Sequence, residues 1–299
     1  MSLKINIAGV EFKNPVIAAS GTFGFGEEFK DYIDLNKLGG ISSKGLTLKK
    51  NPGNPGIRIY ETPAGIMNSI GLQNPGVDHF IENELVFMRK YDTVVIANLG
   101  GHSYDDYRLG AVKLNKADID MIELNISCPN LKEGGMAFGT DPKKAKEVIS
   151  LVRKETNLPL IVKLSPNVTH IGEFAKIAQD CGADAISLVN TFNAMAVDIN
   201  KKKFIFDNKT AGLSGPAIKP IALRMTYEVA QTVDIPVIAM GGIMNVEDCL
   251  EFMMVGASAI QVGTANFSKL DTMIEIIDNL ERYCANNNIS DINDIVGIL

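Results

Sequence analysis

Leu158-Pro159-Leu160-Ile161-Val162-Lys163 and Ile235-Pro236-Val237-Ile238-Ala239-Met240 share one pattern, a proline followed by a short apolar run. Residues 181–186 and 255–260 form a second matching pair, in which a Gly-Ala step precedes the apolar run. The members of the two pairs lie 77 and 74 residues apart, so two successive strand–helix–strand units follow one pattern. Such repetition favours a closed (β/α)8 barrel over an open, doubly wound sheet.

Eight apolar runs of strand length recur along the chain, and amphipathic helical segments separate them. The runs are residues 16–19, 40–43, 94–98, 121–126, 160–164, 185–189, 237–240 and 259–262. Continuous apolar strands that alternate with helices indicate a parallel sheet covered on both faces. We therefore predict a single-domain α/β fold over residues 1–299, a (β/α)8 TIM barrel.

Local signals place the other elements. Helices are expected to start at Asp141-Pro142 and at Asn245, and an amphipathic pattern predicts another over residues 216–233. Residues 5–12 are typical of an N-terminal hairpin that could plug the bottom of the barrel. Residues 190–215 form an insertion after strand six, in which Lys201, Lys202 and Lys203 belong to half of a protruding hairpin.

Composition excludes several classes of protein. The net charge of −6 argues against a nucleic-acid binder, because phosphate recognition needs an excess of cations. No apolar run is long enough to cross a membrane, and the N-terminus lacks a signal-peptide core, so a cytoplasmic location is expected. The four cysteines are widely spaced and the three histidines form no HxH or HExxH motif, which argues against a metal centre.

Polar residues and glycines stand at the ends of the expected strands, where barrels of this kind carry their sites. In chain order they are Ser20-Gly21-Thr22, Ser43-Lys44-Gly45, Asn98, Asn125 and Cys128, Lys163, Asn190-Thr191, Gly241-Gly242 and Gly263-Thr264. Amides, lysines and paired glycines at these ends point to a planar polar ligand that carries a phosphate.

The two glycine pairs and the two lysines each have a plainer alternative. Gly241-Gly242 and Gly263-Thr264 precede helical segments and fit a phosphate, although each alone is more typical of a tight turn. Lys44 and Lys163 end apolar strands, so each needs a partner, which is either an anionic ligand or a protein carboxylate in a structural salt bridge. Residues 63–76 combine a side-chain amide with a Gly-rich turn, and the backbone of that turn could bind a carboxylate.

Cys128 stands where a buried strand runs into a polar loop, within Glu123-Leu124-Asn125-Ile126-Ser127-Cys128-Pro129-Asn130. The Gly-rich residues 132–139 follow it. An isolated cysteine is usually a small buried hydrophobe. Here the flanking amides and the Gly-rich segment favour a thiol that acts on a bound small molecule.

Together these motifs resemble the dihydroorotate dehydrogenase family over nearly the whole chain, and its class 1 members most closely. The motifs in family order are Ser43-Lys44-Gly45, Asn68-Ser69-Ile70-Gly71-Leu72, residues 125–130, Lys163, Asn190-Thr191 and residues 240–243. Cys128 separates class 1 from class 2, whose members carry serine as the base. Residues 71–77 and 134–142 resemble subclass 1B, the NAD-linked form, more than the fumarate-using subclass 1A.

The resemblance implies an FMN-containing barrel that oxidises dihydroorotate to orotate in pyrimidine synthesis. In the family pattern Cys128 removes the C5 proton while hydride leaves C6 for flavin N5, and Lys163 stabilises negative charge near flavin N1. Orotate would be held by Lys44, Asn68, Ser69, Ile70, Gly71, Leu72, Asn125, Asn130, Asn190 and Thr191. FMN would be held by Ser20, Lys44, Gly45, Asn98, Asn125, Lys163, Val189 (through its backbone), Gly215, Gly241, Gly242, Gly263 and Thr264.

The route of the electrons depends on the subclass. The chain carries neither clustered cysteines for an iron–sulfur centre nor a GxGxxG dinucleotide motif. The subclass 1B resemblance implies a second subunit that carries FAD and a 2Fe–2S cluster and reduces NAD, in a complex with two copies of each chain. One alternative is a fumarate-dependent class 1A homodimer. A more remote alternative is a flavin- or phosphate-binding barrel without catalysis.

Overall fold

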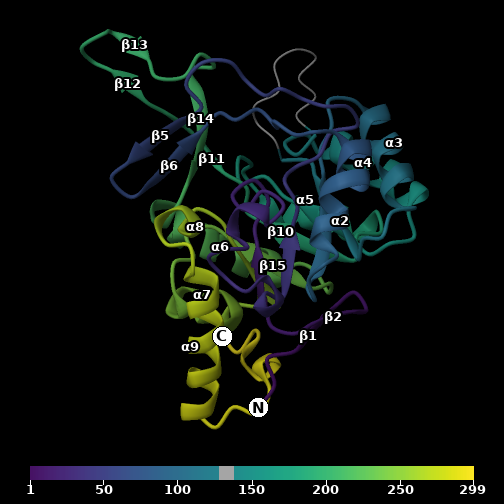
Figure 1. The fold of residues 1–299 in the computed structure, drawn as a ribbon, viewed down its shortest axis with the longest axis vertical. Helices are drawn as coiled ribbons and strands as arrows, with labels where there is room; N and C mark the ends of the chain where they lie inside the picture. The colour runs from purple at the N-terminus through teal and green to yellow at the C-terminus, as the bar shows by residue number, and fades with distance from the viewer. Residues whose placement is uncertain (128–137) are drawn as a thin grey trace.

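The computed structural model describes residues 1–127 and 138–299. Its centre is a closed barrel of eight parallel strands, in the order β10-β15-β16-β3-β4-β7-β8-β9 (Figure 1). The strands are β3 (Val16–Ala18), β4 (Gly40–Ser42), β7 (Val94–Leu99), β8 (Met121–Asn125), β9 (Leu160–Lys163), β10 (Ala185–Leu188), β15 (Val237–Met240) and β16 (Ala259–Val262). All eight predicted strands are present, each to within a residue at either end, and the predicted (β/α)8 barrel is confirmed.

Helices surround the barrel, and successive helices pack against one another. They are α1 (Val77–His79), α2 (Leu85–Met88), α3 (Tyr104–Leu114), α4 (Pro142–Glu155), α5 (Ile171–Asp180), α6 (Lys219–Ala230), α7 (Val246–Met254), α8 (Ala265–Ser268) and α9 (Thr272–Asn286). A π-helical turn (Phe80–Glu84) joins α1 to α2, and 3-10 turns span Glu27–Phe29, Leu35–Lys37, Pro216–Ile218 and Ile292–Ile295. None of the helices in the described part is both long and apolar enough to cross a bilayer.

The predicted helix starts are confirmed in detail. The Asp141 carboxylate accepts hydrogen bonds from the Lys143 and Lys144 amides, and Pro142 occupies the first turn of α4. The Asn245 side chain accepts from the Asp248 amide at the start of α7. The segment predicted as one helix over residues 216–233 begins instead with the 3-10 turn, and α6 follows it.

The N-terminal hairpin is also present, as β1 (Ile5–Ile7) and β2 (Val10–Phe12). Ala8 and Gly9 both have positive φ, as a tight hairpin turn requires. Ile7 and Phe12 are fully buried, and the Phe12 ring lies against Gly40, the first residue of β4. The hairpin therefore lies against the end of the barrel at which the strands begin.

A second sheet at the opposite end was not predicted as a whole. It has four antiparallel strands in the order β11 (Phe192–Met195), β14 (Thr210–Ser214), β6 (Gly65–Asn68) and β5 (Ile59–Thr62). The insertion after strand six thus pairs with the segment after strand two. The protruding hairpin is confirmed as β12 (Val197–Asp198) and β13 (Lys203–Phe204), and it projects beside the hairpin of β5 and β6 (Figure 1).

Candidate active site

A pocket opens where the barrel strands end, and side chains from the strand ends and the second sheet line it. Seventeen of the residues expected to hold FMN or orotate line it: Ser20, Lys44, Gly45, Asn68, Ile70, Gly71, Leu72, Asn125, Lys163, Val189, Asn190, Thr191, Gly215, Gly241, Gly242, Gly263 and Thr264. Asn98 and Ser69 do not line it. Cys128 and Asn130 lie outside the described residues.

Glycine backbone forms one wall of the pocket. Gly215, Gly241 and Gly242 have φ of 101°, 128° and 78°, a region that side-chain-bearing residues rarely adopt. A Cβ on Gly242 would lie 2.7 Å from the Lys219 Cβ and 2.9 Å from the Gly215 carbonyl oxygen. The close packing around Gly242 therefore leaves no room for a side chain there, and because glycines have none, this wall of the pocket is main chain.

Side chains behind this wall hold it in place. Asp248, in the first turn of α7, accepts a hydrogen bond from the Met244 amide at 2.8 Å and pairs with Lys219. Thr264 donates from its hydroxyl to Ser214 at 2.8 Å, which ties the turn after β16 to the end of β14. Ser214 also lines the pocket and was missed from the sequence, although its place directly before Gly215 was a signal.

The two lysines differ in their surroundings. Burial lowers the pKa of the Lys44 ammonium; Glu28 acts in the opposite direction and Arg58 in the same direction. Because burial outweighs the attraction of Glu28, this ammonium gains stability from an anion brought by a ligand. Lys163 reaches the same pocket but has a protein partner, since its Nζ lies 3.6 Å from Glu123 Oε2. The salt-bridge alternative is thus correct for Lys163, which also lines the pocket.

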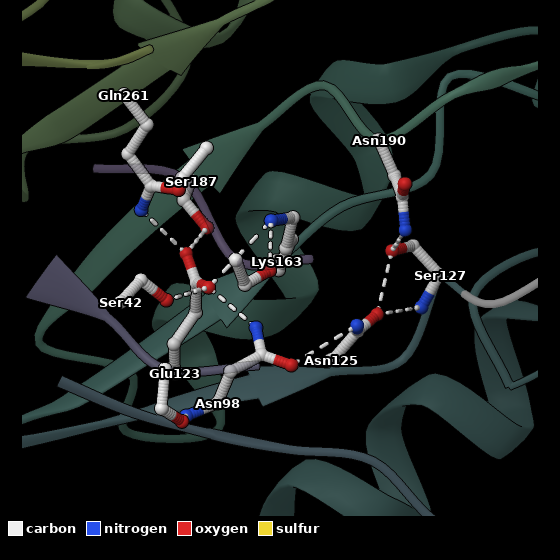
Figure 2. Close-up of polar contacts among 12 residues, drawn as sticks. Ser42, Asn98, Glu123, Asn125, Ser127, Lys163, Ser187, Asn190 and Gln261 are labelled. Carbon is white, nitrogen blue, oxygen red and sulfur yellow. Dashed lines mark hydrogen bonds and ion pairs between the residues drawn. The ribbon is translucent and has the colours of Figure 1, made fainter. Parts of the chain in front are cut away.

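Glu123 is fully buried beneath the pocket and was assigned no role from the sequence. Four neutral side chains donate hydrogen bonds to its carboxylate: Ser42, Asn98, Ser187 and Gln261 (Figure 2). Burial alone would raise the pKa of this carboxyl, but the Lys163 charge and the hydrogen bonds outweigh it and hold the pKa below the ordinary value. Glu123 is therefore ionised at neutral pH. The sequence did contain a sign that Glu123 has a role, because a carboxylate inside an otherwise apolar strand is rarely buried without partners.

A chain of amides runs from Glu123 to the pocket rim. Asn98 accepts from Asn125 Nδ2 at 3.2 Å, and Asn125 Oδ1 accepts from the Ser127 hydroxyl at 2.9 Å (Figure 2). The Ser127 oxygen in turn accepts from Asn190 Nδ2 at 2.7 Å. Asn98 is thus buried behind the pocket and connects to it through Asn125. Ser127 was part of the sequence motif but had been given no role.

The loop that faces these amides carries backbone strain. Gly71 and Leu72 both have positive φ, 72° and 55°, and for Leu72 this conformation costs about 1 kcal/mol or more. Asn74 stabilises it by donating to the Leu72 carbonyl at 2.6 Å. Ser69 faces away from the pocket and is bonded by Asn54 and Asn208. Ile70, Gly71 and Leu72 line the pocket in this strained conformation.

Comparison with known proteins agrees with this architecture. A family model described as dihydroorotate dehydrogenase matches residues 2–284. A protein of Petrotoga mobilis named dihydroorotate dehydrogenase B (NAD(+)), catalytic subunit, is 60% identical over 99% of both chains. Proteins with the same name from Thermoanaerobacter sp. and Geotalea uraniireducens are 54% and 53% identical, over 100% and 99% of this chain and 99% and 98% of their own lengths. The family model and these relatives match the chain across almost its whole length. The chain therefore belongs to the dihydroorotate dehydrogenase family.

Proposed function

We propose that this chain is the catalytic subunit of an NAD-linked dihydroorotate dehydrogenase, which oxidises dihydroorotate to orotate in pyrimidine synthesis. The observation that carries the proposal is the pocket, which combines a glycine wall, two lysines and a set of amides at the ends of the barrel strands. The full-length relatives that bear the name of this subunit support the choice of the NAD-linked form.

The lining of the pocket fits FMN. Gly215, Gly241, Gly242, Gly263 and Thr264 would hold the phosphate through backbone amides. Lys163, kept in place by Glu123 and by Ser20 at 3.1 Å, would set a positive charge beside the flavin ring. Ser20, Lys44, Gly45, Asn125 and Val189 complete the lining part of the proposed FMN set, and Asn98, which is buried behind the pocket, stays in the set on the family pattern alone. Bound FMN supplies the hydride acceptor, and the protein supplies its position.

The amides suit a pyrimidine ring, which offers both donors and acceptors. Asn68, Asn125 and Asn190 line the pocket, and Thr191 is held by the side chain of its neighbour Asn190, which accepts from the Thr191 amide at 2.8 Å. Lys44 and the backbone of residues 70–72 would bind the substrate carboxylate. Asn130 and Ser69 stay in the proposed substrate set on the family pattern alone.

Cys128 is the proposed base that removes the C5 proton. It lies outside the described residues, so the proposal rests on the family motif. A thiol is a fitting base because its ordinary pKa of about 8.5 leaves a small thiolate fraction at neutral pH.

The partner is the second part of the proposal. The relatives are named as catalytic subunits, which supports a separate electron-transfer chain. We propose that the electron-transfer subunit carries FAD and a 2Fe–2S cluster, and that two copies of each subunit assemble. Among the described residues no cluster of three or more His, Cys, Asp or Glu side chains is arranged to hold a metal ion.

An acceptor experiment separates the proposal from its alternatives. The purified FMN-loaded chain is given dihydroorotate with fumarate or with NAD, and with or without the electron-transfer subunit. We expect steady NAD reduction only with that subunit present, and slow turnover with fumarate. Brisk fumarate turnover by the chain alone would instead identify a class 1A enzyme. If orotate does not change the flavin absorption spectrum, the chain is a non-catalytic barrel.

A further inference from the structure

A polar layer crosses the centre of the barrel. Ser42, Glu123, Ser187 and Gln261 come from β4, β8, β10 and β16, which are alternate strands in barrel order. All four are fully buried. In (β/α)8 barrels a layer of four side chains from alternate strands is ordinarily filled by bulky apolar residues. A carboxylate there is costly unless it is fully paired, so its presence calls for a reason beyond packing.

Both oxygens of the Glu123 carboxylate are occupied. Oε1 accepts from the Ser187 hydroxyl at 2.8 Å and from Gln261 Nε2 at 2.7 Å. Oε2 accepts from the Ser42 hydroxyl at 2.9 Å and from Asn98, and it lies 3.6 Å from the Lys163 ammonium. The two oxygens thus differ in what lies beyond them. Oε1 faces only structural groups, whereas Oε2 contacts Lys163, which lines the pocket, and Asn98, which leads to it.

The acceptor-only character of an ionised carboxylate fixes the direction of the amide chain. Asn98 must turn its NH₂ group toward Glu123, so its oxygen must face Asn125. Asn125 must then offer its own oxygen to Ser127, and Ser127 accepts from Asn190. Every hydrogen bond in the chain therefore donates toward Glu123 (Figure 2). Chains of this kind polarise each successive bond, which strengthens the whole.

From this geometry we propose that Glu123 is a positioning residue for the pocket. Through Asn98 it sets which end of Asn125 and Asn190 acts as donor, and through Lys163 it holds the positive charge beside the flavin. Within the described residues one N–H of each of these two amides is used by the chain, which leaves the other for the pocket. The pocket thus offers donors that match the carbonyl oxygens of a pyrimidine-dione. This inference rests on the proposed function.

Glu123→Gln tests the inference. Glutamine has the shape of glutamate but no charge, and its NH₂ group can donate hydrogen bonds where the carboxylate only accepts them. Two quantities are measured on FMN-loaded protein: the orotate Kd, from the change in the flavin spectrum, and the flavin midpoint potential at mildly acidic pH. We expect orotate binding to weaken by about tenfold or more, because the amide chain loses its fixed direction. We expect the potential to rise, because the Lys163 charge is no longer offset.

Ser187→Ala is the matched control. It removes one hydrogen bond from Oε1 in the same buried layer but leaves the contacts of Oε2 intact, so both quantities should stay near the wild-type values. If Glu123→Gln matches Ser187→Ala in both quantities, Glu123 is merely structural and the inference is wrong. If Glu123→Gln does not fold, Glu123→Asp replaces it as the test. Aspartate keeps the negative charge, but its shorter side chain withdraws the carboxylate from Asn98. That variant should weaken orotate binding with little change in potential, and unchanged binding would also overturn the inference.

The same experiments distinguish a failure of the proposed function from a failure of the proposed role of Glu123. A wild-type protein whose flavin is not reduced by dihydroorotate would contradict the proposed function itself. A wild-type protein that is reduced and binds orotate, with a Glu123→Gln variant no different from the control, would contradict only the role of Glu123.

Discussion

Replacing Cys128 by serine is expected to lower the turnover of dihydroorotate at neutral pH by about a hundredfold or more, while the protein stays yellow. A positioned general base contributes on this scale, and a serine hydroxyl ionises far less readily than a thiol. The measurement is the rate at which dihydroorotate bleaches the flavin under anaerobic conditions. In the wild-type protein this rate should rise with pH toward the thiol pKa, about 8.5 when unperturbed.

Cys181→Ser is the control for this substitution. Cys181 is a half-buried free cysteine that does not line the pocket. Its replacement by serine makes the same chemical change elsewhere in the barrel. It should leave the bleaching rate unchanged. A Cys128→Ser protein that bleaches as fast as the wild type would eliminate Cys128 as the base.

Replacing Lys163 by methionine is expected to lower the free energy of unfolding by about 3 kcal/mol at neutral pH. The substitution leaves the Glu123 carboxylate buried without a cation, and breaking one half of a buried pair has costs of this size. The double variant Glu123→Gln, Lys163→Met removes both charges and should recover much of the loss. Denaturant unfolding measures the free energies of unfolding of the single and the double variant. The protein is unfolded without FMN, so that cofactor binding does not contribute.

The pH dependence of this loss has a definite sign. In the wild type the lowered pKa of Glu123 means that its stabilising contribution is present above the ordinary carboxyl value of 4.5 and is lost as the pH falls below it. Without Lys163, burial should raise the pKa of Glu123 above 4.5. The destabilisation of Lys163→Met should then be largest near neutral pH and shrink as the pH falls toward 4.5. A loss independent of pH would contradict an ionised Glu123.

The barrel could be predicted from the sequence because each of its strands is buried on both faces. A strand such as β15 is an uninterrupted apolar run, and capping residues mark the start of several helices, as Asp141 and Pro142 do for α4. The strand ends follow directly from these runs. Most of the predicted site residues therefore line one pocket, since the fold itself brings the strand ends together.

The second sheet could not be predicted in the same way. The strand β5 is largely exposed, with Ile59 and Tyr60 facing solvent, so it lacks an apolar run. Its sheet joins β6 to β14, whose paired residues Asn68 and Gly212 lie far apart in the chain. Pairing between distant, short and polar segments leaves no local pattern. This is why Ile59 and Ile66 were missed as pocket residues.

The buried network beneath the pocket was missed for a different reason. Each of its strands contributes one polar residue, such as Ser42 or Gln261, and a lone polar residue in an apolar strand carries little information. Only the closed barrel shows that these residues converge on Glu123. The sequence left Lys163 with two alternatives, a protein carboxylate or a ligand. The structure shows the protein carboxylate, Glu123, and Lys163 also lines the pocket in which we propose that the ligand binds.

We propose that one pocket at the ends of the barrel strands binds the flavin and the pyrimidine together. A crystal structure of the chain with FMN and orotate tests it most directly. We expect the FMN phosphate against Gly241 and Gly242, the flavin ring beside Lys163, and orotate between that ring and the amides of Asn68, Asn125 and Asn190. Orotate found elsewhere, or a flavin ring remote from Lys163, would contradict it.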